Sequence, residues 1–482
     1  MAIEHFDVLI TGAGLSGVGV ACHLAQKCPD KSFAILEARQ AIGGTWDLFR
    51  YPGIRSDSDM FTLGYNFKPW TSRKGIADGG DIRDYIEEAA KEHNIIDKIR
   101  FGHRVSNANW DSKTKLWTMT AQVDGQERQY TAKYIVGCTG YYDYDEGFTP
   151  DFAGSDDFKG EIVHPQFWPE ELDYKDKKVV VIGSGATAVT LIPSMSREVE
   201  KITMLQRSPT YVVPVPSEDK LAIKLRKWLP ESLVYTLIRS RNIMLTMAFY
   251  NYCKRFPTRA REFIFNFNKK ILPKDFDMSH FTPKYNPWDE RLCAVPGGDL
   301  YKAIYKGKAD VVTDHIDHFV EDGIQLKSGN KLDADIIITA TGLKIVVLGK
   351  INVTLDGQPF DVTDKMSYRG VMFEGIPNAA MVFGYTNSSW TLKADLIADY
   401  FCRMIKFMDN KGYDSVVPVN NDPGMAKKSF LDLSSGYVSR VKNQLPLQGS
   451  KGAWKLHQNY FRDWFSLRLS RFSVKELKYD RK

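Results

Sequence analysis

Two segments of the chain share a pattern in which a short apolar run is followed by closely spaced glycines and then by helical periodicity. The first is FDVLITGAGLSGVGVACHLAQ, residues 6–26, and the second is KKVVVIGSGATAVTLIPSM, residues 177–195. Apolar runs bounded by glycine predict buried strands, and the periodic residues after them predict helices. The chain therefore contains two strand–turn–helix units of the same design.

The rest of the pattern is typical of a mixed α/β fold. Residues 43–70 are rich in Gly, Pro, Asp and aromatic residues, which predicts a long structured loop. Residues 218–270 change to long amphipathic helices with many Lys, Arg and aromatic residues. Helices are also expected at 84–93 and 393–407, and strands at 33–36, 116–123, 128–140, 201–208, 309–316 and 334–342.

The first glycine motif, Gly12-Ala13-Gly14-Leu15-Ser16-Gly17, satisfies the dinucleotide-binding pattern G-x-G-x-x-G. Gly12 allows the tight turn, Gly14 lets a pyrophosphate approach the backbone, and Gly17 lets helix and strand pack closely. The phosphates would lie at the helix N-terminus, where N–H groups favour anions. Glu37 follows the second strand, about 20 residues beyond the motif, where an acid binds a ribose hydroxyl.

The second motif ends in alanine, as Gly183-Ser184-Gly185-Ala186-Thr187-Ala188. Its second strand runs into Arg207 and Ser208, with no acid at the position that corresponds to Glu37. A guanidinium offers several donors to a 2′-phosphate, whereas a carboxylate would repel it. This difference favours NADPH over NADH at the second motif.

One unit suited to an unmodified ribose and one suited to a 2′-phosphate together indicate a flavin, FAD, that is reduced by NADPH. Thr139-Gly140 and Thr341-Gly342 each end an apolar strand, where we expect the chain to cross between domains near the cofactor. The expected fold is therefore α/β, with two Rossmann-like dinucleotide-binding domains and a helical insertion. We expect FAD-binding parts at 1–145 and 335–482, NADP-binding parts at 146–215 and 286–334, and the insertion at 216–285.

Composition excludes several other classes of protein. The formal charge of +6 is modest and forms no basic stripe along the sequence, so nucleic acid is not an expected partner. The six cysteines form no C-x-x-C pair and no metal-like cluster, which argues against disulfide reductases and against a metal site. No secretory leader is recognisable, and no apolar run approaches the roughly 18 residues of a membrane span. A cytoplasmic location is expected.

A longer motif then narrows the class of flavoenzyme. Residues 158–169, FKGEIVHPQFWP, fit F-x-G-x-x-x-H-x-x-x-W-P, and the chain therefore resembles the Baeyer–Villiger monooxygenases. Residues 43–57 also fit the family pattern G-G-x-W-x-x-x-x-Y-P-G-x-x-x-D. The resemblance covers nearly the whole chain and is strongest to the ethionamide-activating branch, through segments such as MLQRSPTY, YNPWDERLC and GYTNSSWTLKADL.

The resemblance implies a mechanism and a set of site residues. NADPH reduces FAD, O2 adds to give a C4a-peroxyflavin, and one oxygen atom enters a ketone, giving an ester or lactone, or a sulfide. Arg291, in YNPWDERLC, matches the catalytic arginine, and Asp57 matches the carboxylate that orients it. His164 and Trp168 would couple cofactor binding to domain movement, and Asn387 and Trp390 would lie near the substrate. The FAD contacts would be Gly12, Gly14, Ser16, Gly17, Glu37, Thr45, Trp46, Asp57 and Val105, and the NADP contacts Gly183, Gly185, Thr187, Ala188, Arg207 and Ser208.

Two other functions stay open at this point. A flavin-containing monooxygenase that oxidises nitrogen or sulfur shares the two nucleotide units, although the 158–169 motif disfavours it. A flavin-bound redox sensor or scaffold without turnover is the other. For the insertion we favour an internal core that also lines the substrate pocket, over helices that contact membrane lipid.

Overall fold

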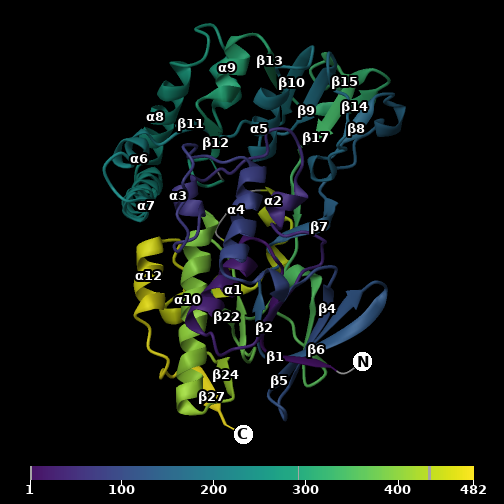
Figure 1. Ribbon diagram of the computed structural model, residues 1–482. Coiled ribbons are helices and arrows are strands. Elements are labelled where there is room, and N and C mark those ends of the chain that lie inside the picture. Colours follow the sequence, from purple (N-terminus) through teal and green to yellow (C-terminus); the bar gives the residue numbers. More distant parts are fainter. Residues whose placement is uncertain (1–2, 291, 432–435, 482) are drawn as a thin grey trace.

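The computed structural model describes residues 3–290, 292–431 and 436–481 of the chain. Figure 1 shows two lobes, one above the other, with helices covering both. The lower lobe is built on a nine-stranded sheet and the upper lobe on a five-stranded sheet. Each lobe contains one of the two strand–glycine–helix units that the sequence predicts, so the α/β fold is confirmed.

The lower sheet combines parallel nucleotide-binding strands with an antiparallel meander. Its order is β20-β19-β4-β5-β6-β1-β2-β3, and β23 pairs with β6. The parallel part contains β1 (Glu4–Thr11), β2 (Phe33–Leu36), β3 (Ile99–Arg100), β6 (Gln126–Gly137) and β23 (Ala379–Met381). The meander adds β4 (Arg104–Asp111) and β5 (Leu116–Val123), and β19 (Asn352–Leu355) and β20 (Gln358–Pro359) close the edge.

Three helices form the main core of the lower lobe. They are α1 (Leu15–Lys27), α4 (Gly79–Glu92) and α10 (Trp390–Lys411), whose buried faces share one apolar cluster with β1. The predicted helices at 84–93 and 393–407 are thus confirmed, and each is longer than its apolar pattern indicated. The predicted loop at 43–70 includes two single-turn helices, α2 (Thr45–Leu48) and α3 (Met60–Leu63).

The upper sheet is entirely parallel, in the order β13-β10-β9-β17-β8. Its strands are β8 (Glu161–Val163), β9 (Lys178–Ile182), β10 (Lys201–Gln206), β13 (Ala309–Thr313) and β17 (Ile336–Thr339). Helices α5 (Ala186–Met195) and α9 (Asp299–Tyr305) share an apolar cluster with it. A second, smaller sheet of β14 (Ile316–Val320), β15 (Gly323–Leu326) and β16 (Lys331–Asp333) lies beside it.

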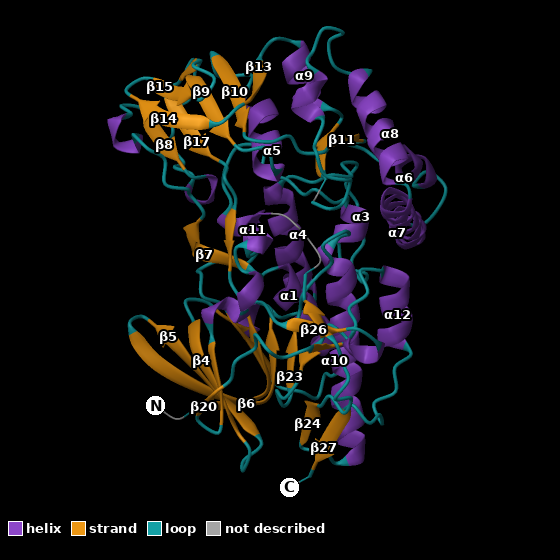
Figure 2. Ribbon diagram, turned by 180° about the vertical axis from the view of Figure 1, so that it is seen from behind, coloured by secondary structure: helices purple, strands orange, loops and turns teal. Residues whose placement is uncertain are grey.

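The chain crosses between the lobes at the two Thr-Gly turns. Immediately after them, β7 (Tyr142–Gly147) and β18 (Leu343–Ile345) pair as an antiparallel ribbon. Figures 1 and 2 both show β7 between the lobes. This agrees with the crossing that the sequence predicts at these turns.

The predicted helical insertion is present, as α6 (Lys220–Leu225), α7 (Glu231–Arg255) and α8 (Pro257–Lys269). It is bounded by β11 (Val212–Val215) and β12 (Cys293–Pro296), which pair in parallel. The C-terminal segment adds α12 (Tyr460–Arg468), and β24 (Ser415–Pro418) pairs with β27 (Leu477–Asp480). No helix within the described ranges is long and apolar enough to cross a membrane.

Candidate functional site

The first glycine motif forms a cradle because two of its glycines leave no room for a side chain. Gly12 has φ +96°, and a Cβ there would lie 2.7 Å from the carbonyl oxygen of Cys138. A Cβ on Gly17 would lie 1.8 Å from the carbonyl oxygen of Gly12, so α1 could not pack against β1. Gly14 is the N-cap of α1, and no side chain caps the first turn. The N–H groups of this turn are therefore open to an anion.

Glu37 is buried directly beside this cradle. Its two carboxylate oxygens accept hydrogen bonds from the backbone N–H groups of Ala13, at 2.5 Å, and Arg39, at 2.8 Å. Burial raises the pKa of Glu37, and these two N–H groups oppose that shift by stabilising the charged form. A carboxylate has about four acceptor positions, so it can still bind a ribose hydroxyl.

A cavity of about 470 Å³ opens from the cradle and brings most of the predicted FAD residues together. Gly17 is the exception and supports the cradle from behind. A cavity bordered by glycine backbone, an open helix N-terminus and a buried carboxylate fits a dinucleotide. The predicted residues that line it are Gly12, Gly14, Ser16, Glu37, Thr45, Trp46, Asp57, Val105 and Trp390.

Trp390, the first residue of α10, closes one side of the cavity. Its indole Nε1 donates to the Ser16 hydroxyl at 2.8 Å, and its ring stacks on Tyr141 with centroids 5.2 Å apart. The neighbouring Asn387 is also buried, but it does not line the cavity, and its amide donates to the carbonyl of Gln458 at 2.9 Å. The two predicted pocket residues therefore occupy different positions, one on the cavity wall and one behind it.

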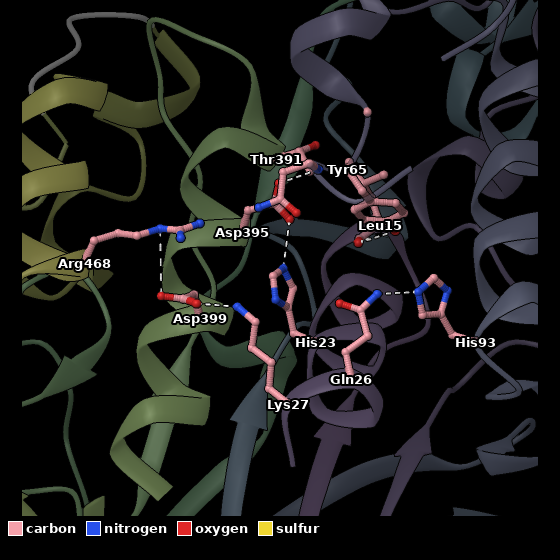
Figure 3. A network of polar contacts seen from close by, with 12 residues as sticks. Leu15, His23, Gln26, Lys27, Tyr65, His93, Thr391, Asp395, Asp399 and Arg468 are labelled. Carbon is pink, nitrogen blue, oxygen red and sulfur yellow. Dashed lines mark hydrogen bonds and ion pairs between the residues drawn. The ribbon is translucent and has the colours of Figure 1, made fainter. Parts of the chain in front are cut away.

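A network of polar contacts joins the helices that carry Ser16 and Trp390. In Figure 3, His23 of α1 points to Asp395 of α10, and Lys27 points to Asp399. His23 and Asp395 are 3.2 Å apart and both almost fully buried. These contacts therefore join the C-terminal half of α1 to the N-terminal half of α10.

Sequence reasoning missed the cavity residues that lie on β7, among them Tyr142, Asp143 and Tyr144. Tyr144 lies 3.3 Å from the Thr45 hydroxyl, and burial raises the pKa of Tyr144 to about 12. Their position directly after the Thr139-Gly140 turn is the signal that could have found them.

The second motif forms a more open cradle on the upper lobe. Gly183 has φ +136°, and a Cβ there would lie 2.3 Å from the carbonyl oxygen of Ala340. A Cβ on Gly185 would meet no atom within 4 Å, and no side chain caps α5. The first turn of α5 therefore faces open space, into which phosphates would fit. Thr187 is half-buried and Ala188 is buried behind it.

Arg207 and Ser208 are both exposed at the end of β10, on the same side as the open cradle. Strand β10 pairs with β9 in the same way that β2 pairs with β1. The end of β10, with Arg207, therefore corresponds in position to the end of β2, with Glu37. Ser184 donates a hydrogen bond to the carbonyl of Ser208 at 3.2 Å, which links the cradle to this strand end. Glu290 interacts electrostatically with Arg207. Burial raises the pKa of Glu290, and the positive charge of Arg207 offsets part of this rise.

His164 lies where the chain crosses between the lobes. Its Nδ1 accepts from the N–H of Gln166 at 3.2 Å, and its ring packs against Gly147, where a Cβ would lie 2.2 Å from Cε1. Burial lowers the pKa of His164, and the backbone carbonyls of Phe148 and Gly342 partly oppose this. Trp168 packs half-buried against Tyr174. His164 is therefore in contact with both crossing segments.

The loop that carries Asp57 is tied to the upper lobe. Arg55 forms a two-nitrogen ion pair with Asp299 of α9, at 2.5 and 3.4 Å, and its side chain is only 9% exposed. Asp57 lines the cavity two residues further on. The predicted catalytic Arg291 lies outside the residues that the structure describes.

Comparison with known proteins identifies relatives over nearly the full length. A family model described as flavin-binding monooxygenase-like matches residues 76–347, and one for an NAD(P)-binding Rossmann-like domain matches residues 10–70. The FAD-containing monooxygenase EthA of Mycolicibacterium smegmatis is 52% identical over 97% of this chain and 95% of its own. The probable FAD-binding monooxygenase AlmA of Acinetobacter baylyi is 51% identical over 99% and 97%.

Solved structures with the same fold are more distant in sequence. A steroid monooxygenase bound to NADP has a TM-score of 0.77 and 21% identity, and covers 99% of this chain and 100% of its own. An open cyclohexanone monooxygenase has the same TM-score and coverage at 20% identity.

Proposed function

The chain belongs to the flavin-binding monooxygenase-like family, and from this premise we propose that it is an FAD- and NADPH-dependent monooxygenase of the Baeyer–Villiger type. It would insert one oxygen atom of O2 into ketones, giving esters or lactones, and would oxidise sulfides to sulfoxides. The small-molecule substrate, and O2 itself, would enter the cavity described above.

The observation that carries this proposal is that one cavity is lined from both lobes. Beside the first cradle, it is lined by Ala186 and Thr190 of α5, the helix that the second cradle opens. A flavin on the first cradle and a nicotinamide on the second could therefore meet in this space. When bound, FAD and NADPH supply the activation of O2 and the two electrons that monooxygenation requires.

The chain's own residues would bind the two nucleotides differently. Glu37 would accept from a ribose hydroxyl of FAD, and Arg207 with Ser208 would donate to the 2′-phosphate of NADPH. The open first turns of α1 and α5 would bind the two pyrophosphates. Thr45, Trp46 and Val105 would complete the FAD site, and Gly183, Gly185, Thr187 and Ala188 the NADP site.

For the oxygen chemistry, the family pattern assigns Arg291 as the fixed cation and Asp57 as the carboxylate that orients it. A cation held in a water-poor site stabilises negative charge that develops on oxygen. Trp390, stacked on Tyr141, would help to exclude water from this space. His164 and Trp168 would couple the lobes, and Asn387 would support the cavity wall through Gln458.

The proposed function is tested by giving the purified yellow protein NADPH and air with a linear ketone, a cyclic ketone or an aryl methyl thioether. We expect esters or lactones from the ketones and a sulfoxide from the thioether, identified by mass. A sulfoxide from the thioether without any ester or lactone from the ketones would instead indicate a heteroatom monooxygenase. NADPH consumption that yields only hydrogen peroxide, with every substrate, would contradict both.

A further inference from the structure

Exposed apolar side chains are concentrated on one part of this molecule. Of the seventeen large apolar side chains that are exposed among the described residues, ten lie in the insertion at 216–285 and three lie at 461–469. Trp228 is 81% exposed, and Leu245 and Phe263 are 60% and 56% exposed. Exposed apolar side chains that are concentrated in one region are typical of an interaction surface rather than of ordinary solvent-facing surface.

Helical periodicity accounts for this exposure on α7. One side of the helix is buried, through Val234, Ile238 and Met247, and is held by the buried Arg239. The other side exposes Leu233, Leu237 and Met244, at spacings of four and seven residues. A surface helix of a protein that remains free in water carries polar residues on that side. The outer side of α7 instead carries these apolar side chains among the exposed Ser232, Thr236 and Ser240, so it is suited to a partner.

Two more helices add to the same side of the molecule. Helix α8 exposes Phe263 and Phe267, one turn apart, and α12 exposes Phe461 and Phe465 with the same spacing. Figures 1 and 2 show α7, α8 and α12 along one side of the molecule in both views. We call the outer sides of these three helices the insertion face.

The insertion also holds the excess positive charge of the protein. Residues 216–285 contain 14 Lys and Arg against 6 Asp and Glu, a net charge of +8, whereas the whole chain carries +6. The other 412 residues therefore sum to −2. Among the exposed cations of the insertion are Lys224, Lys227, Arg255, Arg259, Lys269 and Lys270.

We propose that the insertion face binds the surface of an anionic lipid bilayer, with its apolar side chains in the headgroup layer. Exposed Trp, Phe and Leu combined with Lys and Arg are the composition of interfacial helices. Each cation near an anionic surface strengthens binding, and the effect is screened by salt. A second copy of the chain fits less well, since an isologous dimer would bring one +8 insertion against another.

The test uses the full-length holoenzyme and sedimentation with two kinds of vesicle. One is phosphatidylcholine alone, and the other contains one quarter phosphatidylglycerol. We expect binding to the anionic vesicles at 0.1 M salt and its loss at 0.5 M salt. Lys269→Gln with Lys270→Gln should weaken binding about 25-fold, from about fivefold per cation. Phe263→Glu with Phe267→Glu should abolish it. These side chains are exposed, so neither variant disturbs the core.

Matched controls change the same residue types elsewhere on the surface. Ile3→Glu removes an apolar side chain that is 54% exposed, and Lys113→Gln with Lys327→Gln removes two exposed cations. Both should bind vesicles like the wild type. The proposal is overturned if wild-type protein ignores anionic vesicles or binds both vesicle types equally, or if the control variants lose binding as the insertion variants do. A dimer that Phe263→Glu dissociates, with no vesicle binding, would instead assign the face to a second copy.

Discussion

Replacing Arg239 by methionine tests whether the insertion is held to the flavin-binding lobe by a buried ionic contact. One guanidinium nitrogen donates to the carbonyls of Phe61 and Gly64, at 2.8 and 2.7 Å, and another lies 3.3 Å from the Asp395 carboxylate. The side chains of Arg239 and Asp395 are only 10% and 5% exposed. Methionine would fill much of the space, but the two carbonyls would lose this donor and Asp395 would lose its guanidinium partner.

The expected cost follows from that burial. Removing one partner of a buried ion pair destabilises a protein by about 3–5 kcal/mol, because the other charge remains buried. His23 and the backbone N–H of Asn66 still contact Asp395, so we expect the lower part of this range. The Phe61–Gly64 segment also contacts the start of α10, because Thr62 lies 2.6 Å from the hydroxyl of Ser389. Arg239→Met should therefore lower FAD retention as well.

The same helix provides a matched control. Lys254 of α7 pairs with Asp289 at 3.0 Å, with side chains 41% and 36% exposed, and exposed pairs contribute less than about 1 kcal/mol. The assay is urea unfolding followed by tryptophan and flavin fluorescence for Arg239→Met and Lys254→Met. A loss of stability for Arg239→Met no larger than that for Lys254→Met would show that the buried contact does not hold the insertion to the lower lobe.

Four further predictions concern the two cradles and their coupling. Arg207→Ala should raise the KM for NADPH by tenfold or more and leave that for NADH unchanged, because charge-assisted bonds contribute about 1.5–3 kcal/mol; an unchanged ratio of the two KM values would place phosphate recognition elsewhere. Glu290→Gln should lower the KM for NADPH, because it removes a negative charge that acts on Arg207. Arg291→Ala should leave flavin reduction by NADPH intact and abolish oxygenated product, and normal product from this variant would remove Arg291 from the mechanism. Burial lowers the pKa of His164 below 6.5, so the folded protein binds fewer protons at this residue than the unfolded chain does. The melting temperature should therefore fall as the pH drops below about 6.5. His164→Gln should retain its yellow flavin and show a smaller fall in melting temperature over the same pH range.

Local patterns in the sequence predict the two cradles well. Each depends on contiguous residues, and Gly12 and Gly183 occupy the positive-φ positions that their motifs require. The difference between Glu37 and Arg207 is also visible locally, because each residue directly follows its strand.

Contacts between distant segments could not be predicted in this way. Arg55 and Asp299 are 244 residues apart in sequence, and neither position stands out from other charged residues. The exposure of the apolar side of α7 was also not visible, because periodicity does not show which side of an apolar helix is covered. The sequence favoured pocket lining for this insertion and left lipid contact as the alternative, and the arrangement of α7, α8 and α12 now favours a surface for lipid.

Isotope labelling can show whether both cradles serve one monooxygenation. The most direct measurement supplies ¹⁸O₂ and NADPH with a ketone and determines the mass of the product against NADPH consumed. We expect one labelled oxygen atom in the ester for each NADPH oxidised. Unlabelled product, or label recovered only in hydrogen peroxide, would contradict it.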